Sequence, residues 1–123
     1  AGVTFTLTGL IPKSVGRLSL ASADPLAPPR LQANYLADPY DMQVLTHGLR
    51  LARQAVSSPG LDECCGPEHI DKRIPHDPAS DAYLEEYVRR NVSTNWHPQS
   101  TCRMGPSATS GDVVDRACHV HGA

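Results

Sequence analysis

The hydrophobic pattern of this chain changes its period twice, and that change restricts the folds open to it. Near the N-terminus apolar and polar residues alternate, with Val3, Phe5 and Leu7 on one side of the chain. Between residues 39 and 57 apolar residues recur at helical spacing, and short extended pieces return after residue 97. Alternation indicates strands, and a period near 3.6 indicates helices. Strands, then helices, then strands again predict an α+β fold rather than alternating βαβ units.

Two stretches near the N-terminus are expected to pair as antiparallel strands. Residues 3–8 read Val-Thr-Phe-Thr-Leu-Thr, and residues 17–20 read Arg-Leu-Ser-Leu. A turn-forming run from Pro12 to Gly16 lies between them. Further short strands are expected within residues 31–36, at 113–114 and at 119–121. Together these pieces predict a mainly antiparallel sheet backed by two main helices.

The first helix is expected over residues 39–57. Asp38 can cap its first turn, and Pro39 suits the first helical position. Pro59-Gly60 ends it. Four apolar side chains at helical spacing predict a stripe that faces the core: Leu45, Leu49, Ala52 and Val56.

The second helix is expected over residues 81–91, with Ser80 as its N-cap. Three of its side chains are expected to face inward: Leu84, Tyr87 and Val88. Between the two helices, residues 60–79 are rich in proline and glycine and are expected to form a loop.

The length and charge of the chain exclude several classes of partner. A chain of 123 residues predicts a single domain, residues 1–123. Eleven Lys and Arg against thirteen Asp and Glu give a net charge of −2. The basic residues are scattered, so we expect no nucleic-acid partner. No apolar run approaches the roughly 20 residues of a transmembrane helix, so we expect no membrane segment.

The four cysteines indicate reducing surroundings. Cys64 and Cys65 are adjacent, and a disulfide between neighbours closes a strained ring. Cys102 and Cys118 complete the set, and no C-x-x-C occurs. We therefore expect all four thiols to be free, which suits a cytoplasmic location.

One segment carries most of the functional information. Residues 97–105 read His-Pro-Gln-Ser-Thr-Cys-Arg-Met-Gly. The proline favours extended backbone at His97, and histidine is well suited to move a proton near neutral pH. The chain has no G-x-G-x-x-G or P-loop fingerprint. Since no side chain accepts a hydride, a redox role for His97 requires a cofactor held outside these residues.

This segment resembles the His-Pro-x-Gly-Thr-Cys-x-Met-Gly signature of the glucose–methanol–choline (GMC) flavin oxidoreductases. Three further stretches resemble patterns of the same family, in the same order: residues 11–20, 22–41 and 113–122. The matches cover nearly the whole chain. Four departures from the family pattern leave the substrate class open. Val15 stands for arginine, Ser100 for glycine and Cys118-His119 for a polar–Arg pair, and the loop 60–79 lacks a clean Glu-x-x-Pro-Gly.

The resemblance implies a partial C-terminal substrate-binding domain, an antiparallel sheet backed by helices that lies over FAD in whole members. It implies that His97 is the catalytic residue that takes the hydroxyl proton of an alcohol or choline while hydride leaves for the flavin. Trp96 and Asn95 are assigned to substrate contact, although Trp96 equally suits a core anchor and Asn95 a turn.

The same resemblance places FAD with an FAD-binding domain elsewhere in the same polypeptide. The second catalytic residue would follow Ala123. We therefore expect these residues alone to bind no FAD and to have no activity. Apolar surface that would cover the flavin is left open, which favours self-association of the chain.

A second hypothesis is a stand-alone binding module that holds a metal ion. Cys118, His119 and His121 are metal-ligand types, and two histidines two positions apart on a strand point to one face. The chain lacks a second well-spaced ligand pair, which argues against this hypothesis.

Overall fold

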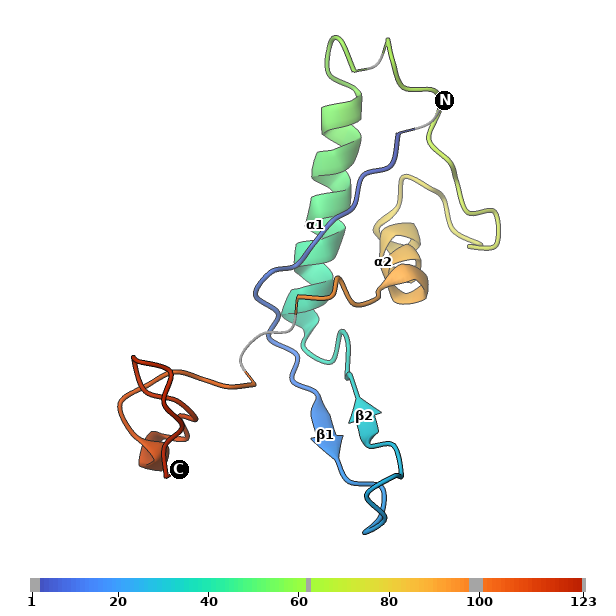
Figure 1. The fold of residues 1–123 in the computed structure, drawn as a ribbon. Helices are drawn as coiled ribbons and strands as arrows, with labels where there is room; N and C mark the ends of the chain where they lie inside the picture. The colour runs from blue at the N-terminus through green and yellow to red at the C-terminus, as the bar shows by residue number, and fades with distance from the viewer. Residues whose placement is uncertain (1–2, 62, 98–100, 123) are drawn as a thin grey trace. The chain divides into compact units, whose positions relative to one another are not determined.

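The structure is a computed structural model that describes residues 3–61, 63–97 and 101–122. Its elements are β1 (Arg17–Ser19), β2 (Arg30–Gln32), α1 (Pro39–Val56), α2 (Asp81–Asn91) and the 3₁₀ helix η1 (Ala108–Ser110). The chain divides into two compact units, Ala1–Ser93 and Thr94–Ala123. Both long helices and the paired strands belong to the first unit (Figure 1).

Helix α1 begins where the sequence predicts and ends one residue earlier. The Asp38 carboxylate accepts the N–H of Tyr40 at 2.8 Å, and Pro39 lies in the first turn. All four side chains of the predicted apolar stripe are half-buried, so the stripe is confirmed. The same face carries the buried Met42 and Thr46, and the Thr46 hydroxyl donates to the Met42 carbonyl at 2.9 Å.

Helix α2 has the predicted bounds and the predicted cap. The Ser80 hydroxyl accepts the N–H of Tyr83 at 3.2 Å. The core of the first unit forms where α1 and α2 pack. Its buried members are Ile74, Tyr83 and Leu84, against which Leu49, Ile70 and Tyr87 pack. The predicted inward positions of Leu84, Tyr87 and Val88 are confirmed. Tyr83, which the sequence does not predict to face inward, is also buried, with 2% exposure.

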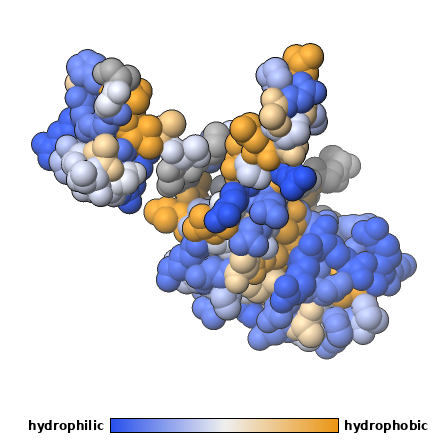
Figure 2. Space-filling view, turned by 90° about the horizontal axis from the view of Figure 1, so that it is seen from below, coloured by the Kyte–Doolittle hydropathy of each residue, from blue (hydrophilic) through white to orange (hydrophobic). Residues whose placement is uncertain are grey.

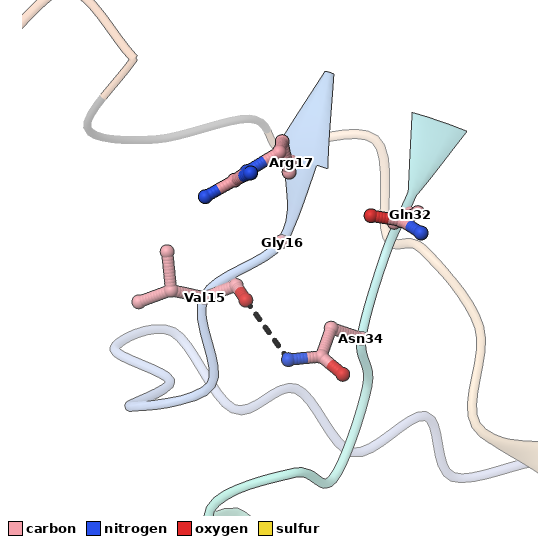
Figure 3. Close-up of a pocket in the computed structure, with 5 residues that line it drawn as sticks. All are labelled: Val15, Gly16, Arg17, Gln32 and Asn34. Atoms are coloured by element: carbon pink, nitrogen blue, oxygen red, sulfur yellow. Dashed lines mark hydrogen bonds between the residues drawn. The ribbon is translucent and has the colours of Figure 1, made fainter. Parts of the chain in front are cut away.

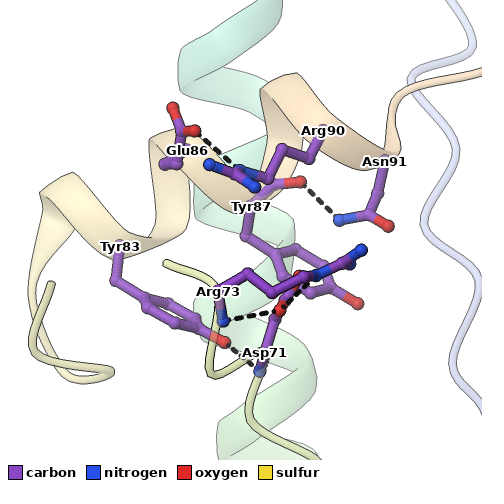
Figure 4. Close-up of polar contacts among 7 residues, drawn as sticks. All are labelled: Asp71, Arg73, Tyr83, Glu86, Tyr87, Arg90 and Asn91. Carbon is purple, nitrogen blue, oxygen red and sulfur yellow. Dashed lines mark hydrogen bonds and ion pairs between the residues drawn. The ribbon is translucent and has the colours of Figure 1, made fainter. Parts of the chain in front are cut away.

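The loop between the helices is fastened to α2 by the buried hydroxyl of Tyr83 (Figure 4). This hydroxyl accepts the backbone N–H of Asp71 at 2.8 Å, and the Tyr83 ring stacks on Tyr87 with centroids 6.2 Å apart. The guanidinium of Arg73 lies 2.7 Å from the Asp71 carboxylate and holds the pKa of that carboxyl well below its usual range. The described residues of the range 60–79 therefore form a loop, as predicted, with a defined anchor.

The sheet is smaller than predicted, and one predicted strand is wrong. Strands β1 and β2 pair antiparallel, whereas residues 3–8 form no strand. This segment runs along α1 instead (Figure 1): Leu7 lies 3.5 Å from the place that a Cβ on Gly48 would take. Side-chain contact with the helix thus replaces strand pairing. The α+β class is confirmed in outline, as two helices and one small antiparallel sheet in the described ranges.

Gly16 allows β1 to approach the chain that follows β2. A Cβ at Gly16 would overlap the carbonyl oxygen of Gln32. The side-chain amide of Asn34, a residue with a φ of 54°, donates to the Val15 carbonyl at 3.0 Å. Together with Arg17 these residues line an open, polar hollow of about 530 Å³ (Figure 3).

A buried carboxylate fastens the N-terminal segment to α1. Asp41, 8% exposed, accepts the backbone N–H groups of Lys13 at 2.7 Å and Ser14 at 2.9 Å. Burial raises the pKa of Asp41, but the Ser14 hydroxyl and the two backbone N–H groups outweigh burial and lower it. The turn before β1 is therefore held against the start of the helix.

Two expectations drawn from composition can be compared with the structure. All four cysteines are free, as predicted. In the described ranges, no helix combines the length and the apolar character needed to cross a membrane. The single-domain assignment and the cytoplasmic location stay predictions.

Candidate functional site

The three predicted site residues stand consecutively at the start of the second unit, and all three are exposed. The indole of Trp96 is 84% exposed, so it does not anchor a core within this unit. The backbone N–H of Trp96 donates to the Thr94 hydroxyl at 3.1 Å, which closes a small turn around Asn95. Asn95 and His97 flank the indole on the same exposed stretch.

Trp96 has a left-handed backbone conformation, with a φ of 59°. This region is unfavourable for a bulky side chain and costs about 1–3 kcal/mol. Such outliers concentrate at functional sites, where the surrounding structure maintains them. The strain at Trp96 therefore adds to the signature residues that mark this stretch as a candidate site; Asn34, Leu36 and Cys118 have a similar backbone conformation elsewhere. Pro98 and Ser100, which the sequence predicts to shape the backbone after His97, lie outside the described residues.

The second half of the signature is built around an ion pair in which the carboxylate is buried and the guanidinium is half-exposed. Arg103 donates from Nε to the Asp112 carboxylate at 2.8 Å, and its guanidinium also contacts the Ser110 carbonyl. Asp112 is 8% exposed. A buried carboxylate needs a charged or hydrogen-bonding partner, and Arg103 supplies it. The pair ties the signature segment to the loop that follows η1.

Gly105 is a glycine because Asp112 fills the space beside it. A Cβ at Gly105 would overlap the Asp112 carboxyl group. The backbone N–H of Gly105 donates to the Val114 carbonyl at 2.9 Å, within a bridge that pairs Met104 with Val114. Asp112 is not predicted from the sequence, because a lone acidic residue in a Gly-Asp-Val-Val run carries no local signal.

The chain's last extended piece closes this network. Val114 also bridges to Val120, and the Nε2 atom of His121 lies 3.0 Å from the Gly105 carbonyl oxygen. Because a carbonyl oxygen only accepts, Nε2 carries the hydrogen of this bond. The predicted extended pieces at 113–114 and 119–121 therefore pair through single bridges. His121 serves as a structural donor to the signature segment.

The alternative metal site at Cys118, His119 and His121, which the sequence already argues against, is not assembled in the structure. In the part of the chain that the structure describes, no three His, Cys, Asp or Glu side chains gather closely enough to hold a metal ion. His119 instead pairs with Asp115 at 3.3 Å. The backbone N–H groups of His119 and Ala117 donate to the same Asp115 carboxylate and lower its pKa. His119 and His121 therefore contact different partners, the Asp115 carboxylate and the Gly105 carbonyl oxygen.

The site and fold define a small α+β chain with an exposed Asn-Trp-His stretch, which is followed in the sequence by a glycine-dependent loop. The family model for GMC oxidoreductases matches residues 12–123. This chain therefore belongs to the GMC oxidoreductase family, and the match is to the C-terminal part of that family's architecture.

Three curated relatives illustrate the match. The chain is 37% identical to an oxygen-dependent choline dehydrogenase of Vibrio vulnificus over 111 residues, which is 90% of this chain and 19% of that protein. It is 40% identical to a glucose dehydrogenase (FAD, quinone) of Drosophila pseudoobscura pseudoobscura, over 92% of this chain and 19% of that protein. It is 35% identical to an alcohol dehydrogenase (acceptor) of Pseudomonas putida, over 98% of this chain and 21% of that protein. The chain spans about a fifth of the length of these relatives.

GMC oxidoreductases are FAD-dependent. The exposed side chains of Trp96 and His97 can face a flat ring system. The sequence has no glycine fingerprint for the diphosphate, and the glycines with positive φ, at 60, 111 and 122, are scattered along the described ranges. Nothing in the described ranges therefore resembles the glycine-rich turn that holds a dinucleotide diphosphate.

Proposed function

We propose that this chain forms the substrate-binding and proton-handling part of an FAD-dependent oxidoreductase acting on the CH–OH group of an alcohol or choline-like substrate. The observation that carries this proposal is His97. It lies in the segment that resembles the family signature, inside the range that matches the family model, and it is exposed beside a strained tryptophan.

His97 is the proton acceptor in this proposal. In its neutral form the imidazole takes the substrate hydroxyl proton as the carbon–hydrogen bond breaks, which avoids a strongly acidic oxygen in the transition state. FAD, when bound, supplies the hydride acceptor that no side chain provides. Trp96 offers a large apolar surface to the substrate carbon skeleton, and the Asn95 amide offers both a donor and an acceptor to its hydroxyl.

The remainder of the active site comes from elsewhere in the same polypeptide under this proposal. The proposal assigns the FAD-binding domain and a second catalytic residue to parts of the polypeptide outside these 123 residues. The relatives' names include choline, glucose and alcohol dehydrogenases. Their variety supports the reaction class and leaves the individual alcohol open.

The test uses the complete FAD-containing polypeptide. With whichever of choline, glucose or a primary alcohol reduces the unaltered enzyme, His97→Ala should slow anaerobic flavin reduction by about 10²–10⁴-fold, the usual contribution of a positioned proton acceptor. Stopped-flow flavin absorbance measures this rate directly.

His76→Ala is the matched control, since His76 is an exposed histidine in the first unit and lies outside the proposed site. The control should retain the original rate. If His97→Ala also retains it while the flavin spectrum is unchanged, His97 has no part in the chemistry. A stoichiometric flavin spectrum from these residues alone would contradict the proposal that FAD binds elsewhere in the polypeptide.

A further inference from the structure

Two thiols stand next to each other in the loop that joins α1 to α2. Cys64 is exposed, Cys65 is half-buried, and both are free. The proposed oxidoreductase chemistry uses neither of them. We propose that Cys64 and Cys65 form a two-thiol binding site for trivalent arsenicals, whose soft arsenic centre binds two thiolate sulfurs at once.

A tight turn holds the two cysteines. The backbone N–H groups of Cys64 and Cys65 both donate to the Leu61 carbonyl oxygen, at 3.1 and 2.9 Å. The N–H of Leu61 donates in turn to the Ser58 carbonyl at 3.1 Å, which ties this turn to the end of α1. Both thiols therefore leave one short, hydrogen-bonded piece of backbone, and a ligand can bind them without moving distant parts of the chain.

The turn has room for a bound group. Gly60 and Gly66 lie on either side of it, and no described heavy atom lies within 4 Å of the place that a Cβ on either would take. No residue from Leu61 to Gly66 that the structure describes is buried. An arsenical with an organic substituent can therefore sit at this surface without displacing core side chains.

The spacing of adjacent cysteines favours arsenic over a disulfide. Cα atoms joined by a trans peptide are about 3.8 Å apart, which is less than the roughly 4.4 Å at which the Cα distances of ordinary disulfides begin. An arsenic atom placed between the sulfurs enlarges the ring and keeps the sulfurs further apart. An As(III) bridge between neighbouring thiols therefore avoids the short ring that a direct disulfide would close.

The binding reaction balances without a change of oxidation state. An organic arsenic(III) oxide reacts with both thiols, so that two S–H bonds break and two As–S bonds form. The oxide oxygen leaves as water with the two protons. No oxidant or reductant is consumed, and a competing dithiol reverses the reaction by exchange.

The other two cysteines provide the internal comparison. Cys102 and Cys118 belong to the second unit and are not neighbours in the sequence. A single thiol forms one As–S bond, which excess monothiol exchanges. Two linked thiols hold arsenic more tightly because the second bond forms at a high effective concentration.

The experiment titrates the reduced chain with phenylarsine oxide in excess mercaptoethanol and follows the adduct by intact-protein mass spectrometry. We expect one adduct per chain, released by 2,3-dimercaptopropanol. Cys64→Ser and Cys65→Ser should each weaken binding by at least about 100-fold, while the double variant Cys102→Ser/Cys118→Ser should bind as the original chain does. Far-UV circular dichroism confirms that each variant keeps its helices.

Two results would overturn the assignment. One is an adduct that persists in both Cys64→Ser and Cys65→Ser. The other is an adduct that disappears in the Cys102→Ser/Cys118→Ser variant, which would place the site in the second unit. Neither depends on FAD or on the fate of His97, so the proposed function can fail while this site stands, and the reverse.

Discussion

Gly105 has no side chain, and the second unit depends on that absence. The buried Asp112 carboxyl occupies the volume that a Cβ would need, and Arg103 neutralises it. The adjoining backbone bonds run from Val113 to the Arg103 carbonyl at 2.8 Å and from His121 to the Val113 carbonyl at 3.0 Å. Because Gly105 has no Cβ, the Arg103–Asp112 ion pair and the backbone bridges around it can form.

Gly105→Ala is therefore expected to destabilise the second unit by about 1–3 kcal/mol, the usual cost of overpacking. A free-energy change of about 1.4 kcal/mol alters an equilibrium constant tenfold. The opening equilibrium of the second unit should therefore rise by about 5- to 150-fold, and hydrogen exchange at the amides of Val113 and His121 should accelerate by the same factor. Gly66→Ala is the matched control, since no described atom lies within 4 Å of its Cβ position. Equal protection in both variants would show that Asp112 does not require the glycine.

At the scale of elements, the start of α1 depends on a carboxylate that must be ionised. Asp41 accepts two backbone N–H groups from the preceding turn, and its pKa is lowered in the folded chain. A group whose pKa falls on folding adds stability above its unfolded pKa, near 4. That stability is lost as pH falls through the lower folded value.

We therefore expect thermal stability to fall as pH is lowered from about 5 to 2, and Asp41→Asn to remove part of this dependence. The variant should also lose about 1–3 kcal/mol near neutral pH, because the two partly buried N–H groups of Lys13 and Ser14 lose a charged acceptor. Circular dichroism melts measure both effects. Asp24→Asn, at an exposed turn, is the control and should keep the full pH dependence; an unchanged pH dependence in Asp41→Asn would contradict this account.

At the scale of the whole molecule, much apolar surface is uncovered within the first unit. Leu18 and Leu31 face each other across β1 and β2, yet they are 66% and 72% exposed. Isolated two-stranded sheets are marginal in water, and exposed apolar patches favour association. Apolar residues reach the surface at several places in the space-filling view (Figure 2).

Self-association of these 123 residues is therefore expected, and sedimentation velocity should show a weight-average mass that rises with concentration. Replacing Leu18 and Leu31 together by serine should shift that rise to higher concentration. Leu26→Ser is the control, since Leu26 is exposed but lies outside both strands. If the chain stays monomeric at every concentration tested, the exposed Leu18 and Leu31 do not drive self-association.

Local chemistry explains which features the sequence predicted well. The bounds and caps of α1 and α2 follow from Asp38, Pro39 and Ser80, because capping and helical periodicity act within one or two turns. The strand within residues 31–36 was nearly right, but the partner assigned to β1 was wrong. Strand pairing is a long-range choice, and the alternation in residues 3–8 suits a helix surface as well as a sheet.

The sequence by itself determined the two helices, the family and the place of His97 in the family signature. Each of these depends on residue types at short, regular spacing. The roles of His97, Trp96 and Asn95 stay predictions. Only the tertiary structure decided that Asp112 fills the space at Gly105, that His121 donates to the Gly105 carbonyl, and that Asp41 holds the turn before β1. Each of these contacts joins residues that no local pattern relates, so only the folded backbone brings them together.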